Sequence, residues 1–182
     1  MKKRKLQNGY VHIYTGTGKG KTTASIGLAF RAASAGFKVC MFQFLKKTGS
    51  ASENCIDMPN FKVTCFDQAH PIFVGAKDRN EKYRELLEKK ILRDLKKVER
   101  TIKSGRYDVI ILDEVINCVS EKFISEEPLL LLASGKPRST ELVMTGRGAT
   151  KRLIGCADYV TELQKVKHPF DSGVFARRGI EY

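Results

Sequence analysis

The chain has no long apolar segment and no apolar signal core. No apolar run approaches the roughly 20 residues that a membrane helix requires, so we expect no membrane span. The basic start, Met1 to Lys5, is not followed by a hydrophobic core of the kind that directs export. These two absences predict a cytoplasmic protein.

Cysteine and histidine are few and scattered. The five cysteines form no Cys-x-x-Cys pair, and the three histidines have no metal-ligand spacing. An odd number of scattered cysteines indicates reduced, mostly structural thiols, so we expect neither a disulfide framework nor a zinc site. No Ser-His-Asp or Cys-His combination points to nucleophilic catalysis. The cysteines are Cys40, Cys55, Cys65, Cys118 and Cys156.

What is present is an ordinary globular composition with an excess of positive charge. The chain has 182 residues, 42% apolar and 29% charged, which predicts one domain over residues 1–182. Within this domain, residues 1–8 form a basic arm, and we expect a polar C-terminal segment, 165–182, near the site. The net charge of +13 suits nucleic acid or a polyanionic small ligand. Since no nucleic-acid module is recognisable and much of the excess lies on one helix and the arm, we do not expect nucleic acid as partner.

Apolar runs alternate with helical patterns along the chain. The predicted strands are Val11–Tyr14, Lys38–Phe44, Phe61–Phe66, Tyr107–Leu112, Glu141–Thr145 and Tyr159–Leu163. The predicted helices are Ala24–Ala35, Arg79–Lys103, Ser125–Ser134 and Ala149–Gly155. This alternation predicts a single-domain α/β P-loop (RecA-like) fold, with a mostly parallel sheet and helices on both faces. Ligands should bind at the C-terminal ends of the strands, beside a loop over Gln68–Lys77.

A glycine-rich turn between the first strand and the first helix is the most specific motif. It reads Thr15, Gly16, Thr17, Gly18, Lys19, Gly20, Lys21, Thr22, Thr23. Backbone N–H groups, a helix N-terminus and a lysine make such a turn a cradle for phosphate. The usual pattern has glycine four residues before Gly-Lys-Thr; here Thr15 holds that place and Gly16 comes one residue late.

Each residue type in this turn has a predicted role. Lys21 contacts phosphate oxygens, Thr22 ligates Mg²⁺, and the glycines let the backbone approach the phosphates, while Thr23 can add a hydroxyl contact. The alternative is a glycine-rich turn without a ligand. The strand before it and the helix after it favour phosphate binding.

An acidic pair follows the apolar run Val109 to Leu112. Asp113 and Glu114 should therefore be delivered to the carboxyl edge of the sheet, on a strand that neighbours the P-loop strand. Asp113 would hold Mg²⁺ directly or through water, and Glu114 would position a water or act as a second ligand. The alternative is an aspartate that caps a helix.

A third strand-turn-helix carries Arg147 between Gly146 and Gly148. A guanidinium matches the geometry of phosphate oxygens, so Arg147 joins Lys21 and Glu114 as a candidate catalytic residue. The alternative is a surface arginine in a tight turn. The basic C-terminal segment is less informative, and His168 before proline favours a structural role.

Together these motifs resemble the ATP:corrinoid adenosyltransferase family. Its TGxGKGKTTA loop is similar to Thr15–Ala24, its DE-x-x-N segment to Asp113–Asn117 and its TGRGA segment to Thr145–Ala149. Its D-x-VTE segment and its K-H-x-F ending with GIE(F/Y) are similar to Asp158–Glu162 and Lys167–Tyr182. The motifs occur in order over nearly the whole chain, and the shifted glycine is itself a feature of the family.

The resemblance implies an unusual use of ATP. In this family the Co(I) of a reduced corrinoid attacks the ribose 5′-carbon, the adenosyl group moves to cobalt and inorganic triphosphate leaves, in adenosylcobalamin biosynthesis or salvage. It further implies Mg²⁺, a flavoprotein reductant and a homodimer. Aromatic residues in the loop after the third strand contact the corrinoid in the family. Many relatives have tryptophan there, but this chain has none, and Phe73 is the candidate.

Two other functions remain open from the residues alone. One is a P-loop kinase or NTPase that cleaves the γ-phosphate. The other is a RecA-like, ATP-dependent nucleic-acid-binding protein, which the positive charge would suit.

Overall fold

Six strands form one parallel sheet at the centre of the molecule. The structure is a computed structural model that describes residues 5–49, 52–70 and 81–180. The strands lie in the order β3-β2-β4-β5-β1-β6, and all five neighbouring pairs are parallel. Their bounds are β1 Val11–Thr15, β2 Val39–Gln43, β3 Phe61–Cys65, β4 Val109–Asp113, β5 Glu141–Thr145 and β6 Tyr159–Glu162. The predicted α/β fold class is confirmed, with a sheet consistent with a P-loop, RecA-like fold.

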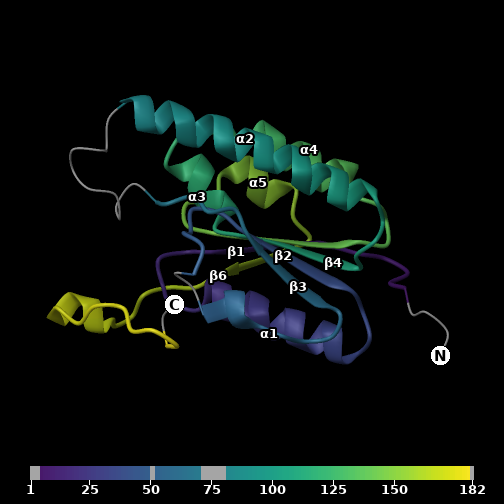
Figure 1. The fold of residues 1–182 in the computed structure, drawn as a ribbon, viewed down its shortest axis with the longest axis horizontal. Coiled ribbons are helices and arrows are strands. Elements are labelled where there is room, and N and C mark those ends of the chain that lie inside the picture. Colours follow the sequence, from purple (N-terminus) through teal and green to yellow (C-terminus); the bar gives the residue numbers. More distant parts are fainter. Residues whose placement is uncertain (1–4, 50–51, 71–80, 181–182) are drawn as a thin grey trace.

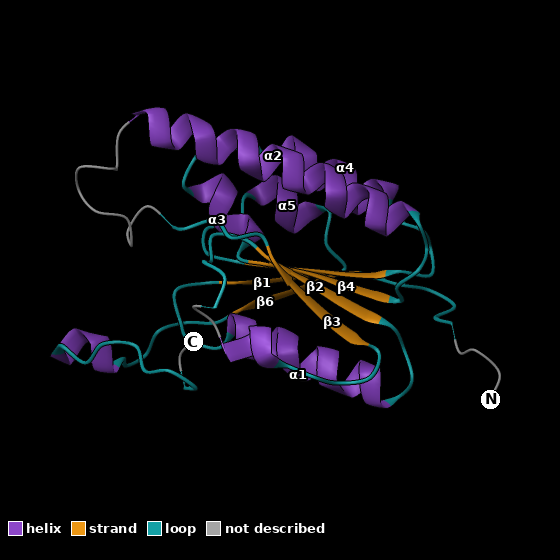
Figure 2. Cartoon of the chain, viewed as in Figure 1, coloured by secondary structure: helices purple, strands orange, loops and turns teal. Residues whose placement is uncertain are grey.

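Helices cover both faces of this sheet. In Figure 1, α1 lies on one face, while α2, α3, α4 and α5 lie on the other. Their bounds are α1 Lys21–Ser34, α2 Glu81–Lys103, α3 Val115–Ser120, α4 Glu127–Gly135 and α5 Lys151–Gly155, with short 3₁₀ turns η1 Ser52–Cys55 and η3 Pro169–Ser172. Figure 2 shows the resulting three layers, with the strands between the two helical layers. Among the described residues, no helix combines the length and apolarity needed to cross a bilayer.

The predicted strands and helices are confirmed, with ends that differ by three residues or fewer where they are described. Residues 79 and 80, with which α2 was predicted to begin, lie outside the described residues. One helix was not predicted: α3, which has six residues and follows the acidic pair directly. Since it makes fewer than two turns, no helical period can emerge from its residues.

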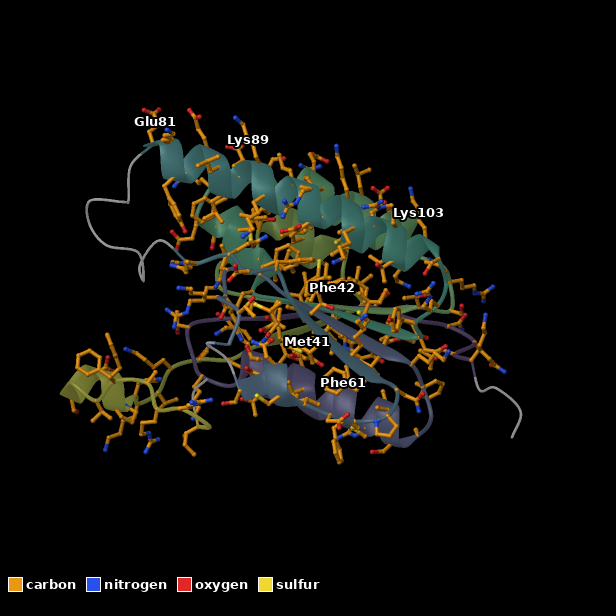
Figure 3. All side chains as sticks on the ribbon, in the orientation of Figure 1. Met41, Phe42, Phe61, Glu81, Lys89 and Lys103 are labelled. Atoms are coloured by element: carbon orange, nitrogen blue, oxygen red, sulfur yellow. The ribbon has the colours of Figure 1, made fainter. Side chains whose placement is uncertain are left out.

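Successive side chains of a strand point to opposite faces of the sheet, so the hydrophobic core is divided into two clusters. Val39, Met41 and Phe61 pack with α1, whereas Cys40 and Phe42 pack on the other face, beneath α2. Figure 3 shows Met41 and Phe61 on the α1 side of the sheet and Phe42 on the opposite side. The central strands β2 and β4 are buried at every position, as expected for a parallel sheet covered on both faces.

One topological expectation was wrong. The strand that ends at Asp113 does not neighbour the P-loop strand, because β5 lies between β4 and β1. The gap is bridged by Thr145, the last residue of β5, whose hydroxyl donates to the Asp113 carboxylate at 2.8 Å. The two motifs still meet, since all three strands end at the same edge of the sheet.

The last strand and the chain beyond it differ from the rest of the molecule. All four residues of β6 are exposed, and β6 is an edge strand that pairs with β1. Beyond it the chain projects past the carboxyl end of the sheet (Figure 1), and Lys165 pairs with Asp171 there. His168 immediately precedes η3, and its ring accepts the Phe170 N–H as a cap of this turn. All five cysteines are free thiols.

Candidate nucleotide site

The glycine-rich turn bends sharply at two positions, Gly16 and Gly20. Their φ angles of 97° and 116° lie in the region that glycine adopts without strain. Thr15 is still an extended residue of β1, in register with Glu162, and its hydroxyl accepts the Ala149 N–H at 3.3 Å. The bend therefore begins at residue 16, which explains why the glycine comes one residue later than in the usual pattern.

Because Gly16 and Gly18 have no side chain, the loop can lie directly against the segment that follows β6. A Cβ at Gly16 would lie 2.4 Å from the Leu163 carbonyl oxygen, and one at Gly18 would lie 2.8 Å from the backbone of Gln164. The Gly18 N–H donates to that Leu163 carbonyl at 2.7 Å, and the Leu163 N–H donates to Thr15. Two of the glycines that we assigned to phosphate approach are therefore also required for contact with the C-terminal part of the chain.

Lys21 opens α1 and folds back over the loop. Its ammonium donates to the carbonyl oxygens of Gly16 and Gly18, both at 2.7 Å. Burial lowers the pKa of Lys21, and the nearby Arg147 guanidinium lowers it further, against the opposing effect of Glu114 and Asp113. A bound anion would relieve the repulsion between these two cations. Gly20, the residue before α1, has no side chain that could cap the helix. The partial positive charge of the helix N-terminus is therefore not offset by a capping group, and it lies next to Lys21.

Asp113 is at the centre of a buried hydrogen-bond network. Its side chain is fully buried, and one carboxylate oxygen, Oδ1, accepts from the hydroxyls of Thr22 and Thr145, each at 2.8 Å. The Thr145 hydroxyl also accepts the backbone N–H of Glu114 at 2.9 Å. Three elements, α1, β4 and β5, are thereby joined at one carboxylate. The structure brings together Thr22 and Asp113, the two oxygen donors expected from separate motifs.

The sequence reasoning missed Lys46, which lies three residues beyond β2. Its ammonium is 2.9 Å from Oδ2 of Asp113 and 3.7 Å from Glu53 of η1. Burial alone would lower the pKa of Lys46, but the charges of Asp113, Glu114 and Glu53 outweigh it and raise that pKa. A lone lysine in a polar loop carries no motif, so only its position after a buried strand could have indicated a role.

Glu114 has an unusual backbone and an unusual carboxyl group. Its φ of 61° is left-handed, a conformation rare for residues other than glycine, and it turns the chain from β4 directly into α3. Burial raises the pKa of Glu114 to about 7, and the negative charge of Asp113 adds to that rise. Strained backbone and a displaced pKa on one residue are typical of functional sites.

Arg147 reaches the site from the turn after β5. Its backbone N–H donates to the Asn117 side chain at 2.6 Å, and Asn117 belongs to α3, the helix that begins after the acidic pair. A Cβ at Gly146 would lie 2.7 Å from that Asn117 amide oxygen, so this glycine is required for the contact. β5 and the loop before α1 end at the same carboxyl edge of the sheet, so Arg147 and Lys21 belong to the same end of the molecule.

The remaining predicted residues are less constrained. Thr17, Lys19 and Thr23 are exposed on the loop and the first turn of α1, where their side chains can meet a ligand. Phe73, the candidate for corrinoid contact, lies outside the described residues, as does most of the loop Gln68–Lys77.

Positive charge also gathers far from this site. A groove of about 480 Å³ between β3 and α2 is lined by Lys62, Lys97, Arg100 and Arg106, with Cys40 and Tyr107. None of the P-loop residues line it. Some of the basic residues behind the +13 net charge therefore lie outside the nucleotide site.

Comparison with known proteins gives the family. A family model for ATP:corrinoid adenosyltransferase BtuR/CobO/CobP matches residues 7–182. Corrinoid adenosyltransferase of Sinorhizobium sp is 31% identical over 97% of this chain and 81% of its own length. The Escherichia coli (strain K12) corrinoid adenosyltransferase is 31% identical over 97% of this chain and 87% of its own length. Corrinoid adenosyltransferase CobA of Salmonella typhimurium is 30% identical with the same coverage. The chain that carries this P-loop, acidic pair and arginine turn belongs to the ATP:corrinoid adenosyltransferase family.

Proposed function

We propose that this protein transfers the 5′-deoxyadenosyl group of ATP to the Co(I) of a reduced corrinoid and releases inorganic triphosphate. The observation that carries the proposal is that Lys21, at the N-terminus of α1, stands next to Thr22, whose hydroxyl donates to Asp113, at the edge of the sheet where β5 leads into the Arg147 turn. Family membership gives that site its reaction: ATP-dependent adenosylation of a corrinoid. It disfavours both a γ-phosphate-cleaving kinase or NTPase and a nucleic-acid-dependent ATPase.

The bonds and charges of this reaction match the site. The electron pair of Co(I) in the corrinoid substrate forms the bond to the 5′-carbon, and the electrons of the broken C–O bond leave with triphosphate. Negative charge therefore grows on the α-phosphate oxygen. The Lys21 ammonium, which the loop carbonyls hold beside the phosphate cradle, and the Arg147 guanidinium, whose backbone Asn117 fixes, would stabilise that charge. Cobalt is itself the nucleophile, so the protein's main tasks are alignment and exclusion of water.

The residues beside the loop fit Mg²⁺. The Thr22 hydroxyl and the carboxylates of Asp113 and Glu114 are hard oxygen donors, and Mg²⁺ in nucleotide sites takes one or two of these together with phosphate oxygens and water. Within the described ranges, no three or more His, Cys, Asp or Glu side chains are grouped to hold a metal ion. The protein would therefore supply one or two of the Mg²⁺ ligands. Burial, and then the negative charge of Asp113, raises the pKa of Glu114, and a bound cation would favour its ionised form. When bound, Mg²⁺ would neutralise charge on the triphosphate.

We further propose a homodimer in the cytoplasm that receives electrons for the corrinoid from a flavoprotein. The resemblance supports these three points. Phe73 is proposed to contact the corrinoid, so Phe73→Ala should reduce turnover of reduced cobalamin more than ATP binding. Equal loss of both would assign Phe73 to the core.

The direct test follows the fate of ATP. Protein, Mg·ATP and chemically reduced cobalamin should yield triphosphate and a light-sensitive Co–C product in equal amounts. ADP and phosphate as the only products would overturn the proposal. Lys103→Ala, an exposed change in the last turn of α2, is the control and should leave the product yield unchanged.

A further inference from the structure

Within the described residues, the buried side-chain polar atoms that have no hydrogen-bond partner in the protein gather in one place. They are Nε2 and Oε1 of Gln43, Oε2 of Glu53, Nδ2 of Asn54 and Oδ2 of Asp113. Of these atoms, Oδ2 of Asp113 has the Lys46 ammonium as an ionic partner at 2.9 Å. We refer to Gln43, Lys46, Glu53, Asn54 and Asp113 as the site cluster.

Gln43 is the most unusual member of the site cluster. It is the last residue of β2, it is 0% exposed, and both polar atoms of its carboxamide lack a partner. It pairs in register with Asp113, the last residue of β4. Met41 and Ile111, two residues earlier on each strand, pack on the α1 face, so Gln43 and Asp113 also point to that face. The carboxamide therefore lies beside the carboxylate that accepts the Thr22 hydroxyl.

A buried carboxamide without partners costs free energy, and an apolar residue of the same shape would not. The protein shows at Gln68 how such a residue is accommodated when its role is structural. Gln68 is 1% exposed, yet it accepts the Leu45 N–H at 3.3 Å and donates to Asp94 at 2.8 Å. Gln43 has neither kind of contact, so the fold alone does not account for it.

The chemistry of the unpartnered atoms indicates what they bind. Phosphate oxygens need only donors, but Gln43 offers a donor and an acceptor side by side. Water bound to a divalent cation is a strong hydrogen-bond donor and suits the carboxamide oxygen. The neighbouring Glu53 and Asp113 oxygens are acceptors of the same kind.

We propose that Gln43 is a positioning residue of the metal–nucleotide site, whose carboxamide holds the water shell of the divalent cation beside Asp113. This inference rests on the proposed Mg·ATP site. Gln43 acts through cation-bound water, so its contribution should depend on the metal. Asn54 and Glu53 of η1 would close the same shell from the loop after β2.

The test compares Gln43→Met with Gln68→Met, two changes that replace a buried carboxamide by an apolar chain of similar length. Calorimetric titration measures ATP affinity with and without Mg²⁺, and thermal unfolding measures stability without ligand. Gln43→Met should weaken Mg·ATP binding about 10-fold, leave metal-free ATP binding within about twofold, and raise the unfolding midpoint by about 3 °C. Gln68→Met should lower the midpoint and leave both affinities of the folded protein unchanged.

Three outcomes would overturn the inference. They are unchanged Mg·ATP affinity in Gln43→Met, equal loss of both affinities, or a fall in midpoint like that of Gln68→Met. Gln43→Asn, which keeps the amide one methylene shorter, is the second variant and should show the same metal-dependent loss. Wild-type protein that binds Mg·ATP but forms no adenosylcorrinoid would overturn the proposed function and leave the Gln43 comparison valid. Wild-type affinity for ATP that is the same with and without Mg²⁺ would overturn the metal site and the inference together.

Discussion

Two buried polar clusters lie near the carboxyl end of β2, on opposite faces of the sheet. On the face covered by α2, Gln68 joins the Leu45 N–H to Asp94, and Arg93 donates to the same aspartate; we call Gln68 and Asp94 the helix cluster. On the face covered by α1, the site cluster surrounds Asp113 and leaves several polar atoms unpartnered.

The difference separates polar residues that hold the fold from polar residues that serve a ligand. In the helix cluster the Gln68 amide and both Asp94 carboxylate oxygens have hydrogen bonds, so the cluster fastens α2 to the chain after β3. In the site cluster two carboxylates, those of Asp113 and Glu53, lie 2.9 and 3.7 Å from the Lys46 ammonium, and burial next to them raises the pKa of Glu114 to about 7. Such an arrangement is less stable without a ligand and more responsive to one.

The largest expected effect is on catalysis. Lys21→Ala should reduce triphosphate release about 1000-fold, equivalent to about 4 kcal/mol, because a preorganised cation at the developing charge is removed. The unfolding free energy should change little, since the Lys21 ammonium bonds only two loop carbonyls in the protein. Single-turnover assays and denaturant unfolding measure the two quantities. A variant that keeps tight ATP binding and full activity would remove Lys21 from the site.

The next largest effect should be on stability. Asp94→Ala removes the acceptor of Gln68 and leaves a buried donor unpaired, which should lower the unfolding free energy by about 3 kcal/mol. Activity of the folded fraction should stay within about twofold of wild type, since Asp94 belongs to α2, on the face of the sheet opposite the nucleotide site. Urea unfolding and the adenosylation assay at a temperature below the transition distinguish the two. A large loss of kcat at full folding would break the contrast between the clusters.

The smallest effect is a gain of stability that depends on pH. Glu114 binds its proton more tightly in the folded state than in the unfolded chain, so ligand-free stability should fall as pH rises from about 4.5 to about 7. Glu114→Gln removes this titration and should be about 2 kcal/mol more stable than wild type at pH 8, but not at pH 4. Its Mg²⁺-dependent turnover should decrease.

Unfolding curves without nucleotide or metal, recorded at several pH values, check the Glu114 prediction. If wild type and Glu114→Gln lost stability in parallel over the whole pH range, the Glu114 carboxyl would not be the group that causes the pH dependence. Glu127→Gln is a suitable control, because its carboxylate is 57% exposed in the ion pair with Arg152.

The sequence predicted the sheet, the main helices and the P-loop because these depend on local patterns. Apolar runs such as Val109 to Leu112 and the helical period of α2 are visible within a short window. The strand order was not visible, and the P-loop strand was wrongly expected beside β4. Lys46 and Gln43 were missed for a related reason: their roles depend on register with Asp113, a residue about 70 positions away.

The contacts between the P-loop and Leu163 affect when the site can form during synthesis. β1 pairs only with β5 and β6, strands more than 120 residues downstream, and the Gly18 N–H is bound by residue 163. A ribosome makes Lys21 early, yet the hydrogen bonds that hold its loop await the last part of the chain. Pairing over such a separation is slow to nucleate, and domains that rely on it expose unpaired strand edges until it is complete. We therefore expect the nascent protein to acquire nucleotide affinity abruptly, after residue 163 leaves the exit tunnel, and chaperones to be most useful before that point.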